Sequence, residues 1–463
     1  MDQSRPALLR TRLSIMMFLQ YAIWGAWLPI LYPFLMGHRG FDLPQTGNCL
    51  AAGAVGAIFG PFIAGQLADR LFATEKLLFA SHLLGAVIVW MLGTVETYES
   101  FLWLSFLYGF VYAPTIALTN SLAFAHIEDR DRDFGPIRLW GTIGWIAAGI
   151  AVGQVLLRLH SPAGADAAEL MAAQNAGRGF AFQLSAVLGV AMAIYCLTLP
   201  HTPPSGGRGE PAGTSGKAMA WIDALREIRL QPLVTLFLIA VPVSIIHQFY
   251  FVFTSDFVGG IQANAQSAGA DAFANAVNGV LGVGGGGLMT IGQMTEIGVL
   301  ALMPILATTL SRKTLLAVGL VAYAARMALF AYTPELGPVL LGVALHGLCF
   351  GCFIFVAFMI VDERTTTDVR ATAQNLFNLV IVGIGIIVGS WFAGSVVGPW
   401  ALDPVLDAAG QTVVAADGTP ETAMNFTRLF SVPMWMAIAC LAALLVFYPG
   451  GSGGRSARPA VSA

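Results

Sequence analysis

The sequence has little charge, little cysteine and no basic stripe, and each shortage excludes a class of protein. Only 11% of the 463 residues are charged, against roughly 25% in a soluble domain. The five cysteines are scattered through apolar runs, where cysteine behaves as a small hydrophobe. Cys349 and Cys352 form a lone C-x-x-C without a second pair or a soluble redox domain, so neither metal nor redox use is expected. Without a basic stripe, nucleic-acid binding is excluded.

In place of charge the sequence has long apolar runs. A membrane span needs roughly 20 mostly apolar residues, because the hydrocarbon holds no water and a helix must satisfy its own backbone groups. Twelve stretches meet this requirement, so the chain is predicted to be an all-α integral membrane protein in a lipid bilayer. The predicted spans are residues 13–36, 48–68, 77–94, 101–124, 139–157, 179–199, 230–255, 289–310, 314–332, 336–361, 371–397 and 429–448.

Lys and Arg residues indicate the orientation, because short cytoplasmic loops retain positive charge. If the N-terminus is cytoplasmic, most of the 23 basic residues fall on that side. The opposite side then holds only Arg39, Arg158, Arg178 and Arg428. Both termini are therefore predicted to face the cytoplasm, with the chain in the inner (plasma) membrane. The first run is too long for a signal-peptide core and is expected to remain as the first helix.

One polar, Pro/Gly-rich stretch, residues 200–217, divides the spans into six and six. Residues 220–231 after it have the spacing of a helix that lies on the membrane surface. The predicted division is residues 1–199 for an N-terminal six-helix half, 200–231 for a cytoplasmic linker with its amphipathic helix, 232–448 for a C-terminal six-helix half and 449–463 for a disordered tail.

Two long loops are expected on the outward side, residues 258–288 and 398–428. Within the first, Gly282 to Gly287 matches the G-x-G-x-x-G pattern of dinucleotide sites. That pattern has meaning only after a strand and before an acidic partner. Neither is present, so nucleotide binding is not expected there.

The eighth span carries an ionisable group, which is costly in a membrane and functional by default. Gln293 and Glu296 lie three residues apart on one helical face, and Glu296 is the only carboxylate in its apolar run. We predict a cavity residue that binds substrate or carries a proton. The alternative is a structural Glu that pairs with a polar residue of a neighbouring helix.

The fifth span places Arg138, Thr142 and Trp145 at i, i+4 and i+7 on one face. A guanidinium, a hydroxyl and a large ring in line suit a polar, ring-bearing solute. The alternative is an Arg that extends to the headgroups, with Trp145 as core packing.

Further candidates have the same spacing. In the first span they are Gln20 and Trp24, because Trp27 fits the interfacial aromatic belt instead. In the second half they are His247 of the seventh span, and His346 with Phe350 in the tenth. A satisfied core group is the alternative for each histidine. Arg326, in the ninth span, is predicted to be structural.

Four segments resemble the nucleoside:H+ symporter family of the major facilitator superfamily. They are FLQYAIWGAWL (18–28), PIRLWGTIGW (136–145), GQMTEI (292–297) and VRATAQNLFN (369–378). The stretch Gly65-Gln-Leu-Ala-Asp69-Arg70 also resembles the superfamily signature GxLaDrxGrk, in which Asp69 and Arg70 would latch the cytoplasmic gate. An ordinary solvated turn is the alternative there. The resemblance implies twelve transmembrane helices around a central cavity that opens to each side in turn.

The resemblance also implies roles for single residues. The family's nucleoside-contacting residues fall on Arg138, Thr142, Trp145, Gln293, Glu296 and Phe350. Five positions depart from the family. Trp145 stands where a Phe is familiar, His346 stands for its Tyr, Gly351 stands for an acid, and the seventh-span Gln and Asn fall on Ser244 and His247.

The function implied is proton-coupled nucleoside uptake. A base would stack on Trp145 or Phe350, and ribose hydroxyls would meet Gln293 and Glu296. Desolvation helps a buried carboxyl to take a proton, so Glu296 is the expected proton carrier, with His247 or His346 in place of the missing acid. The coupling ion is H+. No metal or other cofactor is expected, and the protein is expected to be a monomer, although the sequence leaves the oligomeric state open.

Three alternatives remain open. In the first alternative the protein is still a transporter but its cargo is a sugar or another small polar solute, since Trp, Gln, Glu and Arg also build sugar sites. A membrane enzyme is disfavoured, because the sequence has no H-x-x-x-H pair, no Ser nucleophile motif and no paired carboxylates within a span. A receptor or sensor would bind without transport.

Overall fold

The computed structural model describes residues 4–204, 222–267, 272–366, 369–414 and 418–449. The N-terminal helices are α1 (Ser4–Trp27), α2 (Leu31–Pro33), α3 (Leu43–Arg70), α4 (Thr74–Thr94), α5 (Tyr98–His126), α6 (Arg130–Leu159), α7 (Ala167–Gly177) and α8 (Gly179–Cys196). A 3-10 turn η1 (Leu28–Ile30) and a π-helical segment η2 (Phe34–His38) continue the line of α1.

The C-terminal elements are α10 (Leu233–Ser267), α11 (Ala272–Leu281), α12 (Gly286–Thr309), α13 (Arg312–Tyr332), α14 (Leu336–Ala344), α15 (His346–Leu348), η3 (Cys349–Phe355), α16 (Val356–Arg364), α17 (Arg370–Asn378), η4 (Leu379–Ile384), α18 (Gly385–Trp391), η5 (Phe392–Val397), α19 (Gly398–Trp400) and α20 (Phe426–Phe447). The short strands β1 (Leu402–Pro404) and β2 (Thr422–Met424) form an antiparallel ribbon. The protein is therefore mostly helical.

Eleven helical segments of the described residues are long and apolar enough to cross a membrane. Each coincides with one of the predicted spans. The remaining prediction, residues 48–68, lies within α3, a helix of 28 residues. Several α3 side chains lie outside the described residues, among them those of Asp69 and Arg70.

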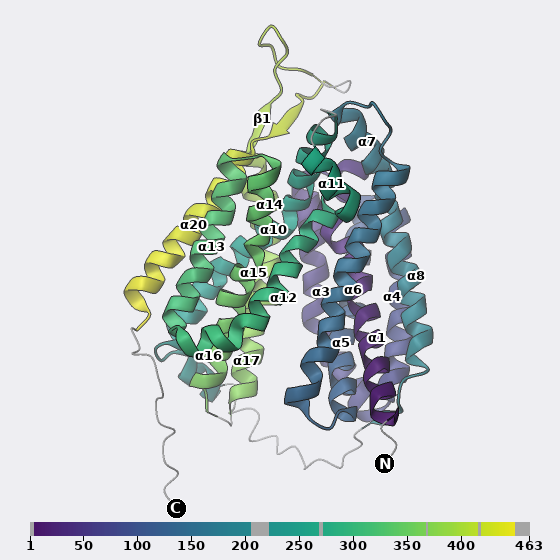
Figure 1. The fold of residues 1–463 in the computed structure, drawn as a ribbon, viewed down its shortest axis with the longest axis vertical. Coiled ribbons are helices and arrows are strands. Elements are labelled where there is room, and N and C mark those ends of the chain that lie inside the picture. The colour runs from purple at the N-terminus through teal and green to yellow at the C-terminus, as the bar shows by residue number, and fades with distance from the viewer. Residues whose placement is uncertain (1–3, 205–221, 268–271, 367–368, 415–417, 450–463) are drawn as a thin grey trace, which may run out of the picture.

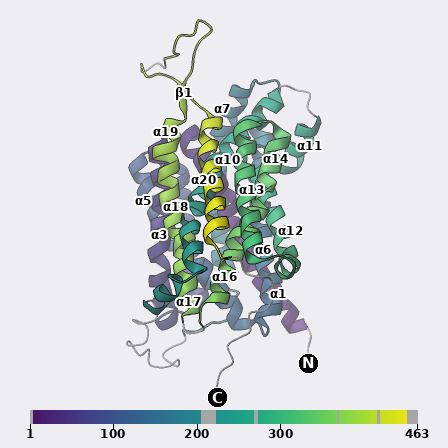
Figure 2. The ribbon, with the colours of Figure 1, turned by 90° about the vertical axis from the view of Figure 1, so that its left-hand side faces the viewer.

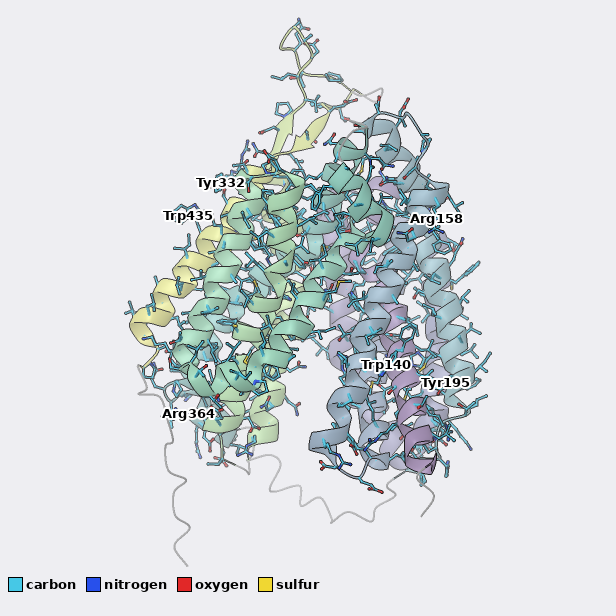
Figure 3. All side chains as sticks on the ribbon, viewed as in Figure 1. Trp140, Arg158, Tyr195, Tyr332, Arg364 and Trp435 are labelled. Carbon is cyan, nitrogen blue, oxygen red and sulfur yellow. The ribbon has the colours of Figure 1, made fainter. Side chains whose placement is uncertain are left out.

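Large apolar side chains lie exposed on the outer surface of these helices. Trp103 on α5 is 70% exposed and Trp435 on α20 is 62% exposed. Figure 3 shows Trp435 and Tyr332 pointing away from the bundle. An exposed apolar surface of this extent needs an apolar neighbour, which a bilayer supplies.

Buried apolar side chains fall into two clusters. The N-terminal cluster is built mainly from α1 to α8, and the C-terminal cluster mainly from α10 to α20. Figures 1 and 2 show the two groups of helices side by side, with the β1–β2 ribbon at one end of the molecule and the beginning of α1 at the other. We call these the ribbon end and the terminus end. Toward the terminus end, α12 and α17 diverge from α5 and α6 (Figure 1).

The prediction of a loop over residues 258–288 is wrong. Helix α10 continues to Ser267, and α11 occupies residues 272–281. Of the residues that the structure describes here, the glycine-rich segment before α12 forms a turn, in which Gly282, Gly284 and Gly285 have φ of 79°, 79° and 82°. These angles are unfavourable for any residue with a Cβ, so the glycines serve a tight turn. Gln262 closes this turn by accepting from the Gly285 N–H and donating to the Gly282 carbonyl, each at 3.0 Å.

The other predicted loop, residues 398–428, contains α19, the ribbon and the first turn of α20. Of the predicted surface helix, residues 222–228 are helical. Residues 205–221 of the linker and 450–463 of the tail lie outside the described residues.

Candidate functional site

The stripe of Arg138, Thr142 and Trp145 on α6 lies against α1. Glycines bring the two helices together: a Cβ at Gly25 would lie 2.6 Å from the Cα of Trp145. Small residues allow such close helix contacts in membranes. The Arg138 guanidinium carbon lies 3.9 Å from the centroid of the Tyr21 ring, a distance typical of a cation–π contact. The guanidinium is thus held against α1.

Gln20 and Trp24 also lie on α1, but they differ in access. Gln20 is 1% exposed, and its Nε2 donates to the Thr115 hydroxyl at 2.7 Å. The Tyr112 hydroxyl donates to the Gln20 carbonyl. Trp24 is half-buried, with its ring centroid 5.2 Å from that of Tyr112. The Gln20 side chain is therefore buried against α5, whereas Trp24 remains partly exposed.

Gln293 and Glu296 lie on α12, where α15 approaches very closely. A Cβ at Gly347 would lie 2.5 Å from the Thr295 carbonyl carbon and 2.7 Å from the Glu296 nitrogen. The Thr295 hydroxyl donates to the Ala344 carbonyl at 2.7 Å. These contacts fix Glu296, whose side chain is 19% exposed, beside the neighbouring His346.

His346 is the centre of a polar cluster within the C-terminal bundle. Its Nε2 lies 3.8 Å from Glu296 Oε2, and its Nδ1 lies 3.1 Å from Arg326 Nη1. The rings of Tyr250 and His247 lie 4.8 Å and 5.3 Å from the His346 ring. The two predicted histidines and Glu296 are thus brought together, with Arg326 added.

His247 has a protein partner of its own. Its Nδ1 lies 2.7 Å from the Tyr323 hydroxyl. Ser244, one turn earlier on α10, is 4% exposed and donates to the Val241 carbonyl. Of the two positions, only His247 is partly exposed.

The helix after His346 carries Phe350 and Gly351. Phe350 is half-buried against the C-terminal cluster. Gly351 is buried, and a Cβ there would lie 2.5 Å from Val299 Cγ1. An acidic side chain at residue 351 would therefore require Val299 to move.

The two sets of residues meet through α6 and α12, which pack against each other. A Cβ at Gly149 would lie 3.0 Å from Thr290 Cγ2. Arg138 and Glu296, from the two clusters, therefore lie on two helices that pack directly against each other.

Toward the ribbon end, glycines allow helices of the two clusters to come into direct backbone contact. A Cβ at Gly153 of α6 would lie 2.7 Å from the Leu281 carbonyl oxygen, and one at Gly47 of α3 would lie 2.8 Å from the Ser390 carbonyl oxygen. Backbone therefore touches backbone at two places. The ribbons of α12 and α17 lie farther from α5 and α6 at the terminus end (Figure 1), so the closest backbone contacts described here between the clusters are on the ribbon side.

Sequence reasoning missed several residues of these contacts. Arg178, placed on the outward surface, is fully buried and interacts electrostatically with Asp256 of α10. Among the described residues its guanidinium nitrogens have no hydrogen-bond partner. The sequence signal was present, because Asp256 interrupts an otherwise apolar stretch. Tyr21 carried no such signal.

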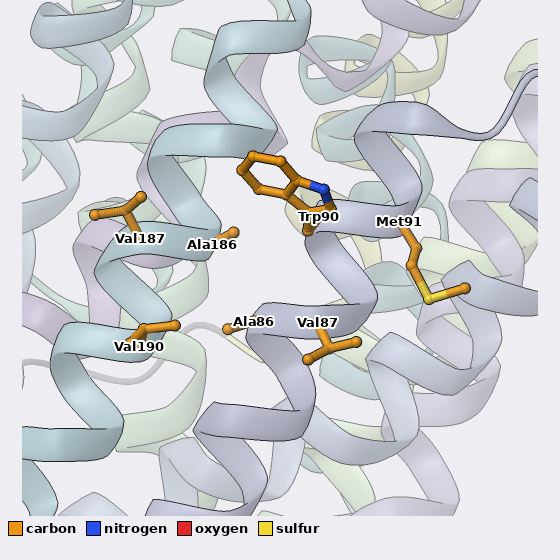
Figure 4. A pocket seen from close by; sticks show the side chains of 7 residues that line it. All are labelled: Ala86, Val87, Trp90, Met91, Ala186, Val187 and Val190. Atoms are coloured by element: carbon orange, nitrogen blue, oxygen red, sulfur yellow. The ribbon is translucent and has the colours of Figure 1, made fainter.

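A groove of about 480 Å³ lies elsewhere, between α4 and α8 (Figure 4). Its lining is entirely apolar: Ala86, Val87, Trp90, Met91, Ala186, Val187 and Val190. It offers no polar partner to a hydrophilic solute and does not include any predicted site residue. In the part of the chain that the structure describes, no group of three or more His, Cys, Asp or Glu could hold a metal ion.

Comparisons with known proteins agree with this arrangement. The chain is 31% identical over 392 residues to the putative nucleoside transporter YegT of Escherichia coli K12, covering 83% of each chain. It is 28% identical over 404 residues to the xanthosine permease of the same organism, covering 86% of this chain and 90% of the permease.

The fold is similar to that of a solved nucleoside transporter. The crystal structure of NupG superposes with a TM-score of 0.73 at 23% identity, covering 94% of this chain and 98% of NupG. The family model described as nucleoside H+ symporter matches residues 8–449. The chain therefore belongs to the nucleoside H+ symporter family.

Proposed function

We propose that this protein takes up nucleosides together with protons across the inner membrane by alternating access. One observation carries the proposal: α6, which bears Arg138, packs against α12, which bears Glu296, where the two clusters face each other. A transporter of this class binds its solute between two such bundles, near the middle of the bilayer.

The proposed architecture has twelve spans in two halves, residues 1–199 and 232–448, joined by a cytoplasmic linker over 200–231. Helix α3 supplies the span that the eleven segments leave out. Both termini are cytoplasmic, so the terminus end is the inner side and the glycine contacts at Gly47 and Gly153 close the outer side. The protein works as a monomer. Asp69 and Arg70 latch the inner gate when it closes.

Binding in this architecture uses the stripe of α6 and the face of α12. A flat base stacks against Trp145, Trp24 or Phe350, which are each half-buried. Arg138 and Thr142 meet the base, and ribose hydroxyls donate to Glu296 and accept from Gln293. Buried Gln20 shapes the wall through Thr115. His346 and His247 line the C-terminal side.

Proton coupling is assigned to Glu296. A carboxyl in a low-dielectric site takes up a proton more readily than one in water. In the proposed cycle Glu296 is protonated from outside, solute binds, and the proton leaves once the inner side opens and rehydrates. No cofactor is required beyond H+.

Gradient-driven uptake into proteoliposomes tests this assignment. Glu296→Gln should lose nucleoside accumulation driven by an inward proton gradient, while counterflow exchange persists. Glu335→Gln, which alters an exposed carboxylate at the N-terminus of α14, is the matched control and should accumulate normally. Unchanged accumulation in Glu296→Gln would reject Glu296 as the proton carrier.

A binding screen tests the solute. Thermal shifts across nucleosides, nucleobases and sugars should single out nucleosides, and Arg138→Ala should lose the shift. If free sugars compete with uridine or adenosine uptake as well as nucleosides do, the alternative of a sugar transporter replaces this proposal. Binding without accumulation against a gradient would point to a sensor.

A further inference from the structure

Arg326 is the most unusual charged residue in the C-terminal bundle. It lies in the membrane-spanning helix α13, with a relative exposure of 0%. Its guanidinium carbon lies 4.2 Å from the Tyr250 ring centroid and 5.1 Å from that of Tyr323. Among the described residues its only hydrogen bond is to His346, and no carboxylate forms a salt bridge with it. A buried cation without a paired anion is costly, so its retention calls for a role.

The contact with His346 determines the state of that imidazole. A guanidinium has only donors and cannot accept a hydrogen bond. Nδ1 of His346, 3.1 Å from Arg326 Nη1, must therefore be the acceptor. The ring proton is then on Nε2, and Nε2 is the atom that faces Glu296 Oε2 at 3.8 Å.

Protonation of His346 would break this arrangement. It would set an N–H on Nδ1 against the N–H of Arg326 and place a second positive charge beside a buried one. Like charges at such a distance disfavour the charged form. The rings that contact His346, those of His247, Tyr250 and Phe251 on α10, bring no negative charge. The carboxylate that faces it, that of Glu296 on α12, lies 3.8 Å from Nε2, beyond hydrogen-bond distance.

Packing around the His346 ring keeps it in place beside Arg326. The His346 ring is stacked on Tyr250 at 4.8 Å with an interplanar angle of 20°. A Cβ at Gly292 would lie 2.9 Å from the Tyr250 hydroxyl and 3.0 Å from His346 Cβ. Glycine at this point of α12 therefore leaves the space that the stacked rings occupy.

We propose that Arg326 is a positioning residue that holds His346 as the neutral Nε2–H tautomer, so that His346 donates toward Glu296 and does not itself carry the transported proton. The inference rests on the proposed function of Glu296. It replaces the expectation that a histidine takes over from the acid missing at Gly351. The separation of 3.8 Å is longer than a hydrogen bond, so the donor engages Glu296 directly when the carboxylate moves closer, or through a ribose hydroxyl or a water between them.

Nitrogen NMR of the full-length protein in nanodiscs tests the tautomer without transport. With histidine labelled in ¹⁵N and the signal assigned by its loss in His346→Gln, we expect a protonated Nε2 and an unprotonated Nδ1 that do not change between about pH 5 and 8, the range in which histidine ordinarily titrates. A His346 signal that titrates in this range, or a proton on Nδ1, would overturn the inference. The wild-type spectrum decides this even if no Arg326 variant folds.

Transport then tests the roles. Gln at residue 346 can accept from Arg326 and donate toward Glu296, as the neutral imidazole does. His346→Gln should therefore slow uptake but keep its dependence on the proton gradient. Arg326→Met removes the cation beside Nδ1, so in this variant the ¹⁵N signal of His346 should titrate as an ordinary histidine does. Loss of coupling in His346→Gln would make His346 the carrier and contradict the inference. Retained coupling in Glu296→Gln would instead reject the proposed function.

Discussion

The guanidinium carbon of Arg138 lies over the Tyr21 ring, 3.9 Å from its centroid. This contact fixes a cationic group on α6 through an aromatic ring on α1. Cation–π contacts contribute about 0.5–2 kcal/mol, depending on how far they are desolvated. Tyr21 therefore supports the guanidinium of Arg138.

Replacement of Tyr21 should weaken nucleoside binding through Arg138. Tyr21→Leu removes the ring, and we expect a loss of affinity of about fivefold, equivalent to roughly 1 kcal/mol. Tyr21→Phe keeps the ring face and should retain most of the affinity. Titration calorimetry with a nucleoside measures both variants. An equal loss in Phe and Leu would mean that the hydroxyl, and not the ring, supports Arg138.

Gly347 should tolerate no side chain, because its Cβ would lie 2.5 Å from the Thr295 backbone. Overpacking of this kind costs about 1–3 kcal/mol. Gly347→Ala should therefore lower the melting temperature in detergent and reduce uptake, since it pushes His346 away from Glu296. Gly337→Ala in α14, where a Cβ meets nothing within 4 Å, is the matched control. A melting temperature as high in Gly347→Ala as in that control would contradict the close contact.

How much of this site the sequence alone predicts depends on the kind of signal. Apolar runs predict the helices. Helical spacing predicts that one face of the fifth span carries Arg138, Thr142 and Trp145. The loop predicted over residues 258–288 is wrong, because a segment rich in Ala and Asn can also form helix. In α11, however, Ala274, Asn278 and Leu281 are buried at helical spacing.

Contacts between helices were beyond sequence reasoning. Arg326 and His346 are 20 residues apart on different helices, and no pattern along the chain pairs them. Which ring supports Arg138 depends on how α1 packs against α6, and this is set by small residues such as Gly25 and Gly144. The predicted seventh span ends at residue 255 and so excludes Asp256, although α10 continues to Ser267.

The closed contact at the ribbon end predicts a shift in conformation when Gly153 is enlarged. A side chain there would meet the Leu281 carbonyl oxygen, so Gly153→Val should favour the state that is open at the ribbon end. A cysteine introduced at the fully buried Val283 should then react faster with a membrane-impermeant maleimide, by about tenfold for each ~1.4 kcal/mol of shift.

Gly279→Val provides the control for this experiment. It lies in the neighbouring helix α11, where a Cβ meets nothing within 4 Å. The reaction rate at Val283→Cys should stay at the level of the unmodified background. If both valine variants raised the rate equally, local loosening of α11 and not opening between the clusters would explain the result.

The junction between the ribbon and α20 should depend on pH through Asp403. The Asn425 side chain donates to Asp403 Oδ2 at 2.8 Å, and Arg428 donates to Oδ1. The hydrogen bond from Asn425, which has the larger effect, and that from Arg428 lower the pKa of Asp403. The ordinary pKa of an aspartate is about 3.9. Because the pKa of Asp403 is lower in the folded state than in the unfolded state, its ionised form stabilises the fold at any pH above the unfolded-state pKa. This stability is lost as the pH falls through the folded-state pKa.

We therefore expect the ribbon to stay ordered from pH 7 to about pH 4 and to loosen only below that. Amide-exchange protection factors over β1 and β2, which correct for the intrinsic effect of pH, should fall in this acid range. Asp403→Asn should lower protection at pH 7 and remove the acid transition, because a neutral amide binds Arg428 more weakly. Glu421→Gln alters a carboxylate beside β2 in the same ribbon and should leave the transition in place. A transition that persists in Asp403→Asn would assign it to another carboxylate of the ribbon.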